Sequence, residues 1–417
     1  MHLTAIVLRL ALAFQAVAVL GGCGLLDLRK QATLAEQFGQ VSGRVERLTK
    51  VDGALHVVAA EAGVSETEFV IRDALVAGAD GSFRFPALLP GTYFIGAFVD
   101  ANGDGVAQPA SEPVAYYNTG GLAPEPIAIA AGDRRVLPAL TVRAPLPEIA
   151  DVRSINGSGA ATRNIGRTVF LSDPMFTQEH AALGLWRPVE FLKTVGGGLF
   201  MLQDYDPARV PVVFVHGMNG NPLEWAPVIE TLDKTRFQPW VLYYPSGLRL
   251  DVVSEYLDRA IDLLARRYGV KTVQVVAHSM GGLVARTFVQ RHQARGHPPQ
   301  VTLLVTINSP LRGMASAAKG VDMSPIVVPA WRDVALNSDF IVRMRDEPWP
   351  VDVPWHLVFA YTEGEDGDGV VLLDSQIPLK LQPQAVRIHG FRGTHAGLLA
   401  DAKFLKRIGP ILESALP

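Results

Sequence analysis

The feature that most constrains the fold is an alternation of apolar strand-like runs and helical segments after residue 205. The runs lack a polar face, so strands built from them would be buried on both sides, which is typical of a parallel sheet covered by helices on each face. The stretch 250–269 has the amphipathic pattern of a surface helix. We therefore predict an α/β domain with a doubly wound, mostly parallel sheet over residues 166–417. Its strands are expected at 210–217, 238–245, 272–279, 301–310, 355–362 and 385–390.

A region of different texture precedes this domain. Between residues 39 and 143, short β-type runs are separated by Gly, Pro, Asn and Asp, which predicts a small all-β sandwich. The segment GSFRFPALLPGTYFIGAFVD, residues 81–100, resembles transthyretin-like or carboxypeptidase-regulatory-like modules. Residues 144–165 are rich in Pro, Gly and Ser and are predicted to be a linker. From its position along the chain, we expect the β-module to be a spacer or a unit that binds envelope partners.

The N-terminal region has the features of an export signal. Residues 3–20 form an apolar run interrupted by Arg9 and Gln15, and small residues follow it. A transmembrane anchor is the alternative interpretation, but the run is barely long enough to cross a bilayer.

The sequence LGGC, which ends at Cys23, resembles a bacterial lipobox. The resemblance implies that residues 1–22 are a lipoprotein signal peptide and that Cys23 is lipidated and anchors the protein to a membrane. Residues 23–38 are then expected to be a short polar tether with one or two helical turns. Gly24 stands where an aspartate would imply retention in the inner membrane, so the resemblance favours the outer membrane of a Gram-negative host.

Composition excludes several other classes of protein. Charged residues make up 19% of the chain, the net charge is −3 and no basic run stands out, so nothing supports nucleic-acid binding. Cys23 is the only cysteine, which rules out a disulfide within the chain. The length of 417 residues suits two domains. The composition leaves the oligomeric state unknown.

A serine stands at a strand-to-helix corner in VVAHSMGGLVAR, residues 275–286. The residues two before and two after Ser279 are Ala277 and Gly281, and a tight, strained turn requires small residues there. A hydroxyl at the start of a helix lies where the helix dipole favours negative charge. The alternative is that Ser279 only caps the helix.

This corner resembles the nucleophile elbow of the α/β-hydrolase superfamily, in which bacterial lipases share the A-H-S-M-G form. Ala277 departs from the usual glycine and is small enough for the turn. His216-Gly217, after the strand at 210–215, resembles the HG motif of lipases, with a plain strand-ending turn as the alternative. The resemblance implies an oxyanion hole made by the backbone N–H groups of Met218 and Met280.

The same resemblance implies a catalytic acid and a histidine, in that order, after the serine. His395 in GTHAGLL precedes the last helix and is the expected base, whereas His389 ends a strand and is expected to be structural. Asp368 in EDGDGVVLLDSQ resembles the acid loop of bacterial lipases and of GPI inositol-deacylase-like hydrolases. Asp366 is a competitor for the acid, and Asp374 is a weaker one.

Several other features have a plain structural interpretation beside a functional one. Asp100, Asn102 and Asp104 match the opening of a calcium loop, but a hairpin turn explains them better because these residue types tolerate positive φ. The insert at 311–350 has two equally supported interpretations: a lid over an apolar site, or ordinary packing under a long loop. Residues 243–247 end a strand at the sheet edge where Ser279 is expected, and they could line the pocket there. The histidines outside the triad are expected to be structural or on the surface: His180, His278, His292 and His297.

The sequence therefore predicts a membrane-tethered serine ester hydrolase of the lipase or carboxylesterase type, which acts on acyl or lipid esters through an acyl-enzyme. Such a triad needs no cofactor and no metal. A thioesterase or acyltransferase would use the same residues. A binding lipoprotein that keeps an inactive hydrolase fold is the alternative from another class.

Overall fold

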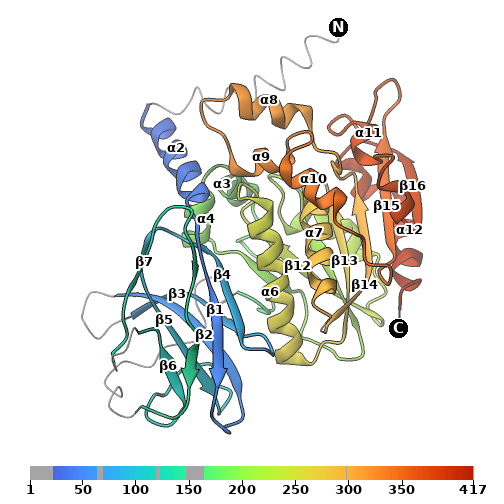
Figure 1. Cartoon of the computed structure of the whole chain (residues 1–417). Helices are drawn as coiled ribbons and strands as arrows, with labels where there is room; N and C mark the ends of the chain where they lie inside the picture. The colour runs from blue at the N-terminus through green and yellow to red at the C-terminus, as the bar shows by residue number, and fades with distance from the viewer. Residues whose placement is uncertain (1–21, 63–68, 119–122, 147–163, 297, 417) are drawn as a thin grey trace.

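The structure is a computed structural model that describes residues 22–62, 69–118, 123–146, 164–296 and 298–416. The expected signal peptide except for Gly22, most of the predicted linker and His297 lie outside these ranges. In Figure 1 a β-domain at lower left stands beside a larger α/β domain, and α2 lies above the β-domain. No helix in the described ranges is both long and apolar enough to cross a bilayer.

Over its described residues, the β-module has nine strands in two sheets. One sheet has the order β4-β1-β8, with β9 also paired to β1, and the other has the order β3-β2-β5-β6, with β7 also paired to β5. Side chains from both sheets, such as Val41, Phe85 and Ile95, form one buried core between them. This is the predicted all-β sandwich. Its strands are β1 (Gly39–Arg47), β2 (Ala54–Ala62), β3 (Phe69–Val76), β4 (Ser82–Leu88), β5 (Gly91–Asp100), β6 (Val114–Tyr116), β7 (Ile127–Ile129), β8 (Arg134–Val136) and β9 (Leu140–Val142).

The second domain is built on a seven-stranded sheet with the order β10-β12-β11-β13-β14-β15-β16. Only β10 runs antiparallel to its neighbour, so the predicted mostly parallel sheet is confirmed. Its central strands are apolar on both faces because helices cover both of them. The strands are β10 (Gly198–Met201), β11 (Val210–Val215), β12 (Phe237–Tyr243), β13 (Thr272–His278), β14 (Gln300–Ile307), β15 (Trp355–Tyr361) and β16 (Arg387–Arg392).

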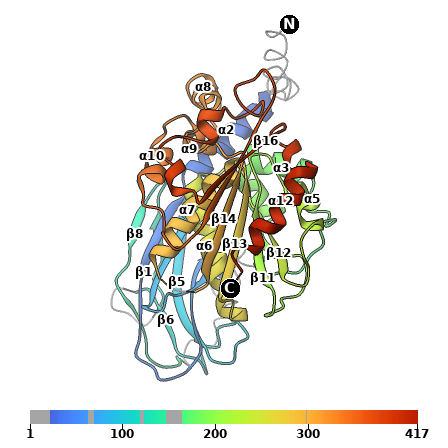
Figure 2. The same ribbon diagram turned by 90° about the vertical axis from the view of Figure 1, so that its right-hand side faces the viewer.

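Helices pack on the two faces of this sheet as separate layers, which Figure 2 shows from the side. Helices α6, α7, α9 and α10 contribute to one buried core, and α4, α5 and α12 contribute to the other. The bounds of the helices are α3 (Gln178–Trp186), α4 (Pro188–Thr194), η2 (Pro222–Trp225), α5 (Ala226–Glu230), α6 (Leu250–Tyr268), α7 (Met280–Ala294), α8 (Ala315–Met323), α9 (Pro329–Val334), α10 (Asp339–Asp346), α11 (Leu373–Gln376), η3 (Gln382–Gln384), η4 (Gly397–Ala400) and α12 (Ala402–Glu413).

Most of the segment that was predicted to be a tether is helical. Helix α2 (Gly22–Glu36) contacts α4, α3 and α9 of the α/β domain. Leu28 and Ala35 are buried in these contacts, and the backbone N–H of Glu190 donates to the Gln31 side chain at 3.0 Å. The expected polar tether with one or two turns is therefore wrong for residues 23–36, because the few apolar side chains of this segment pack on the surface of the α/β domain.

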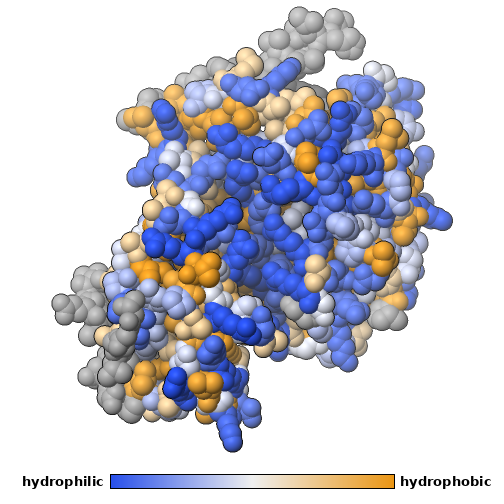
Figure 3. Space-filling view, in the orientation of Figure 1, coloured by the Kyte–Doolittle hydropathy of each residue, from blue (hydrophilic) through white to orange (hydrophobic). Residues whose placement is uncertain are grey.

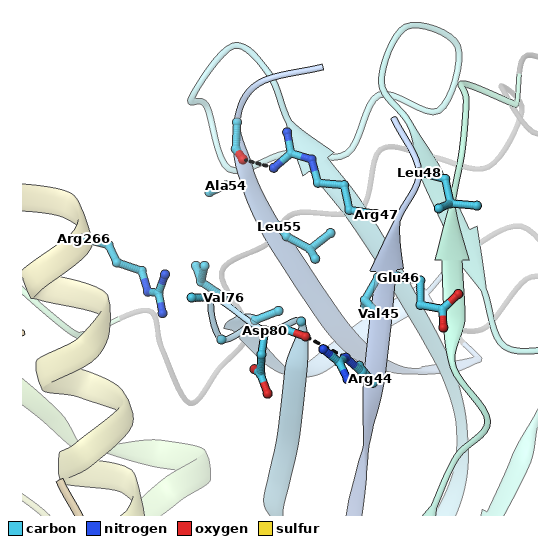
Figure 4. Close-up of a pocket in the computed structure, with 15 residues that line it drawn as sticks. Arg44, Val45, Glu46, Arg47, Leu48, Ala54, Leu55, Val76, Asp80 and Arg266 are labelled. Atoms are coloured by element: carbon cyan, nitrogen blue, oxygen red, sulfur yellow. Dashed lines mark hydrogen bonds between the residues drawn. The ribbon is translucent and has the colours of Figure 1, made fainter. Parts of the chain in front are cut away.

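The module rests against α6 through ion pairs. Asp73 on β3 pairs with Arg259 at 2.8 Å, and Arg84 on β4 pairs with Glu255 at 3.2 Å. A cavity of about 770 Å³ lies at one side of this junction, lined by module strands and by Arg266 of α6 (Figure 4). None of the predicted site residues lines this cavity.

Candidate active site

Ser279 lies at the corner between β13 and α7 in a strained backbone conformation. Its φ is 52° and its ψ is −129°, although it is not a glycine. Its N–H donates to the carbonyl oxygen of Ile307 at 2.8 Å, which ties the corner to the end of β14. The neighbouring strand thus compensates for the strain, and the serine is held at the carboxyl edge of the sheet.

The glycines around the corner are required by close backbone approach. A Cβ at Gly281 would lie 2.4 Å from the carbonyl oxygen of Val215, and a Cβ at Gly217 would lie 2.8 Å from the Ser279 Cβ. Ala277, the departure from the usual pattern, is fully buried on β13. Glycine is therefore necessary where strand β11 passes the elbow, whereas alanine fits on the strand side.

The structure brings Ser279, His395 and Asp368 into one hydrogen-bonded chain. His395 Nε2 lies 2.9 Å from Ser279 Oγ, and His395 Nδ1 lies 2.6 Å from Asp368 Oδ2. The other carboxylate oxygen of Asp368 accepts the N–H groups of Val370 and Val371 at 2.9 and 2.8 Å. Asp368 is buried, so its carboxylate has a single orientation toward the imidazole. This is the geometry that a serine nucleophile and its base require.

The competing acids and the competing histidine lie elsewhere. Asp366 is exposed, and Asp374 is exposed and paired with Arg312. His389 lies on β16 with its Nε2 3.0 Å from the Nδ1 of His356. None of these three candidates has a hydrogen bond to Ser279 or His395 within the described part of the chain.

Two backbone N–H groups remain available beside Ser279. Met280 begins α7, where N–H groups have no partner inside the helix, and Met218 follows the HG motif in the loop after β11. Neither N–H donates a hydrogen bond to another described residue. His216 is buried with its ring stacked on Tyr244, and burial lowers the pKa of this imidazole. The HG segment thus carries a neutral, packed histidine rather than a second base.

Three further residues hold the histidine loop, and only one of them was singled out from the sequence. The carbonyl oxygen of His395 lies 3.2 Å from His278 Nε2 and accepts a hydrogen bond from Asn308 Nδ2 at 2.8 Å. Glu224 lies 3.2 Å from His278 Nδ1. Asn308, directly after β14, could have been found as a polar residue at the carboxyl end of a buried strand. Glu224 carries no comparable signal.

Residues 243–247 support the loop that bears Met218. The hydroxyl of Tyr244 donates to the carbonyl oxygen of His216 at 2.7 Å, and the N–H of Asn219 donates to Ser246 Oγ at 3.0 Å. These contacts place the segment behind the HG loop, where it positions that loop.

The insert at 311–350 folds into α8, α9 and α10 beside this edge. Helix α8 has no buried residue, whereas Val328, before α9, is buried. Met323 at the end of α8 is 81% exposed. One part of the insert is thus ordinary packing, and α8 lies on the outside.

The calcium-like loop is closed by its own hydrogen bonds. Asp100 accepts the N–H groups of Gly103 and Gly105 at 2.8 and 2.9 Å, and Asn102 Nδ2 donates to Asp104 at 3.0 Å. These are the contacts of a turn built by Asn and Asp side chains, the interpretation that the sequence favoured.

The expectation that His292 lies on a surface is wrong. His292 is fully buried on α7, where Nδ1 lies 2.7 Å from Asp258 and Nε2 lies 2.7 Å from the carbonyl oxygen of Pro299. Burial opposes the charged imidazole, but Asp258 outweighs it and raises the pKa of His292. Asp258, Asp262 and His292 lie close enough together to hold a metal ion. Arg295, however, pairs with Asp258 at 2.6 Å and supplies a positive charge there. The cluster is an ion-pair network that joins α6 to α7.

Comparison with known proteins agrees with this architecture. Residues 249–397, which include Ser279, Asp368 and His395, match the family described as an alpha/beta hydrolase of unknown function. No curated protein matches the chain by sequence. The C-terminal domain therefore has the α/β-hydrolase fold.

Solved structures with a similar chain path cover half of this chain. One is the product of the gene lin2722 of Listeria innocua, with 20% identity over 50% of this chain and 96% of that one at a TM-score of 0.40. A second is the mature lipase BlEst2 of Bacillus licheniformis, with 18% identity over 50% and 94% at a TM-score of 0.41. A third is the monoacylglycerol lipase of Paleococcus ferrophilus, with 16% identity over 52% and 99% at a TM-score of 0.39.

Proposed function

We propose that the protein is a serine hydrolase of acyl or lipid esters, held on a membrane through a lipidated Cys23. The observation that carries the proposal is the chain from Asp368 through His395 to Ser279, at a strained corner with two available N–H groups. His395 removes the proton of Ser279 as its oxygen attacks the ester carbonyl. The N–H groups of Met218 and Met280 stabilise the oxyanion. Asp368 orients the imidazole and stabilises its cation.

The acyl-enzyme then forms as His395 returns its proton to the departing alcohol. A water molecule, deprotonated by the same imidazole, attacks the acyl carbon; the bond from that carbon to Ser279 Oγ breaks, His395 returns the proton to Oγ, and the acid leaves. Each step uses side chains and backbone groups of this chain. The low exposure of Asp368 keeps its carboxylate out of bulk water, which strengthens its interaction with the imidazolium.

The test is hydrolysis of p-nitrophenyl esters of graded chain length by the wild type, by Ser279→Ala and by the control Ser316→Ala, an exposed serine on α8. We expect activity in the wild type and the control and none in Ser279→Ala. A preference for long chains identifies a lipase, and one for short chains a carboxylesterase. Failure of the wild type on every ester, together with no labelling by a fluorophosphonate, would contradict the proposal and leave a binding protein. Labelling without ester turnover would favour the thioesterase or acyltransferase alternative.

The proposed anchor needs its own test. We expect the protein to be exported and carried on the outer membrane, with an acylated N-terminal peptide beginning at Cys23. The mass of that peptide, isolated from the membrane fraction, measures this directly. Recovery of a Cys23→Ser variant in the same fraction at the same level would contradict a lipid anchor.

A further inference from the structure

The helix that follows Cys23 is docked on the catalytic domain at both of its ends. Near its start, Asp27 forms an ion pair with Arg187, which precedes α4. At its end, Glu36 pairs with Arg249 at 3.4 Å and with Arg332 of α9 at 3.1 Å. The α2 backbone at Cys23, one turn before Asp27, therefore lies next to this docked segment.

That place lies at the same end of the domain as Ser279. The N–H of Ala330 in α9 donates to the carbonyl oxygen of Gly247, in the loop after the carboxyl end of β12. Carboxyl ends of parallel strands meet at one edge of a sheet, and Ser279 follows β13 at that edge. Figures 1 and 2 show α2 and α8 at this end of the molecule and the β-module at the other. The module precedes the catalytic domain in sequence but does not separate α2 from it in space.

Exposed apolar side chains lie on the elements that surround this edge. Leu26 of α2 is 70% exposed, Met323 of α8 is 81% exposed and Leu372, beside the acid loop, is 53% exposed. Figure 3 shows hydrophobic surface over α2 and α8, whereas the face over α6 is mainly hydrophilic. Arg29 and Lys30, on the next turn of α2, are exposed as well. Apolar residues with neighbouring cations suit a surface that inserts shallowly among anionic lipid head groups.

We propose that this apolar end, defined by Leu26, Met323 and Leu372, rests on the lipid surface that holds Cys23, with the sheet edge that carries Ser279 facing the bilayer. The proposal rests on the proposed function and names the source of its substrate: an acyl ester of the membrane to which the enzyme is anchored. Cys23 belongs to α2 itself, so the anchoring residue is in the same helix that docks on the domain. The β-module then points away from the membrane.

Cys23 is the only cysteine, and the proposed anchor places lipid on its sulfur, so one introduced cysteine can be labelled selectively on the full lipidated chain. A cysteine is introduced by Met323→Cys, or by Val136→Cys on the β-module, a site that is 80% exposed, and carries an environment-sensitive fluorophore. The proteins are placed in vesicles of phosphatidylethanolamine and phosphatidylglycerol. We expect a blue shift and quenching by brominated lipid at residue 323 and neither at residue 136. Equal spectra at the two sites, or quenching only at residue 136, would overturn the proposal.

A second measurement separates this proposal from the proposed function. Met323→Asp is expected to lower turnover of a long-chain ester in the vesicles about tenfold, since it removes one inserted apolar side chain. Turnover of a soluble short-chain ester should stay unchanged, and Val136→Asp should change neither rate. Vesicle turnover that is equal in both variants would refute the docking surface alone. If the wild type hydrolyses neither the long-chain ester in vesicles nor the soluble short-chain ester, the proposed function is refuted. The fluorophore would still report the orientation.

Discussion

The ion pair between Asp73 and Arg259 joins the module to α6 and allows a sharp test of how the domains are held together. Arg259 donates to the two carboxylate oxygens of Asp73 at 2.8 and 3.0 Å, and the side chains are only 15% and 8% exposed. Burial alone would lower the pKa of Arg259, but Asp73 outweighs it and the pKa is raised. Removal of either partner leaves an uncompensated buried charge, which costs about 3–5 kcal/mol. Removal of one partner from an exposed ion pair would cost only about 0–1 kcal/mol.

We therefore expect Asp73→Leu and Arg259→Met each to destabilise the protein by about 3–5 kcal/mol. The double variant replaces the pair by apolar side chains and should return to within about 1 kcal/mol of the wild type. Urea unfolding measures this with two signals. Every tryptophan lies in the α/β domain, between Trp186 and Trp355, so tryptophan fluorescence follows that domain while circular dichroism follows both. In the single variants the transition seen by circular dichroism should begin at a lower urea concentration than the fluorescence transition.

The control is Arg392→Ala, which breaks an ion pair with Glu363 whose side chains are 66% and 78% exposed. It should change the free energy of unfolding by less than about 0.5 kcal/mol. Single variants at Asp73 and Arg259 that behave like this control would refute the reasoning, as would a double variant whose destabilisation is the sum of the two.

Three further predictions concern the catalytic domain. Asp368→Asn should lower kcat about 10³–10⁴-fold without changing the urea midpoint, because the amide favours the wrong tautomer of the histidine; an unchanged kcat would point to another acid. Gly281→Val should abolish fluorophosphonate labelling, since its Cβ would lie 2.4 Å from a carbonyl oxygen of β11, and normal labelling would contradict that clash. Arg286 lies 4.6 and 4.5 Å from the rings of Trp349 and Trp355, and burial lowers its pKa to about 9. Arg286→Lys should lower the free energy of unfolding by about 2 kcal/mol, as the ammonium cannot stack; equal urea midpoints would exclude this.

The elements that sequence predicts best are those whose cause is local. The strands were recognisable because continuous apolar runs need cover on both faces, and Ser279 was recognisable because the small residues that its corner requires are adjacent in the chain. Helix α2 was missed for the opposite reason. Its polar composition suits a tether, and the surface that buries Leu28 and Ala35 is supplied by residues more than a hundred positions away.

The choice among acids shows the same limit within the site. Asp366 and Asp368 stand two residues apart with a glycine after each, so the sequence left both open. What separates them is the turn between Gly367 and Leu372 that buries Asp368, where two backbone N–H groups and the imidazole meet its carboxylate. Only the folded loop creates that difference in burial.

The ends of two neighbouring strands both contribute to the distance between Ser279 and His395. At the end of β13, His278 contacts the carbonyl oxygen of His395, and the next residue, Ser279, donates its N–H to Ile307 at the end of β14. The residue after Ile307 is Asn308, whose side chain donates to that same carbonyl oxygen of His395. Each strand therefore holds both partners of the Ser279–His395 hydrogen bond. Because β13 and β14 are paired up to His278 and Ile307, the Ser279–His395 distance is tied to the ends of these two strands as well as to the loops that carry His395 and Asp368.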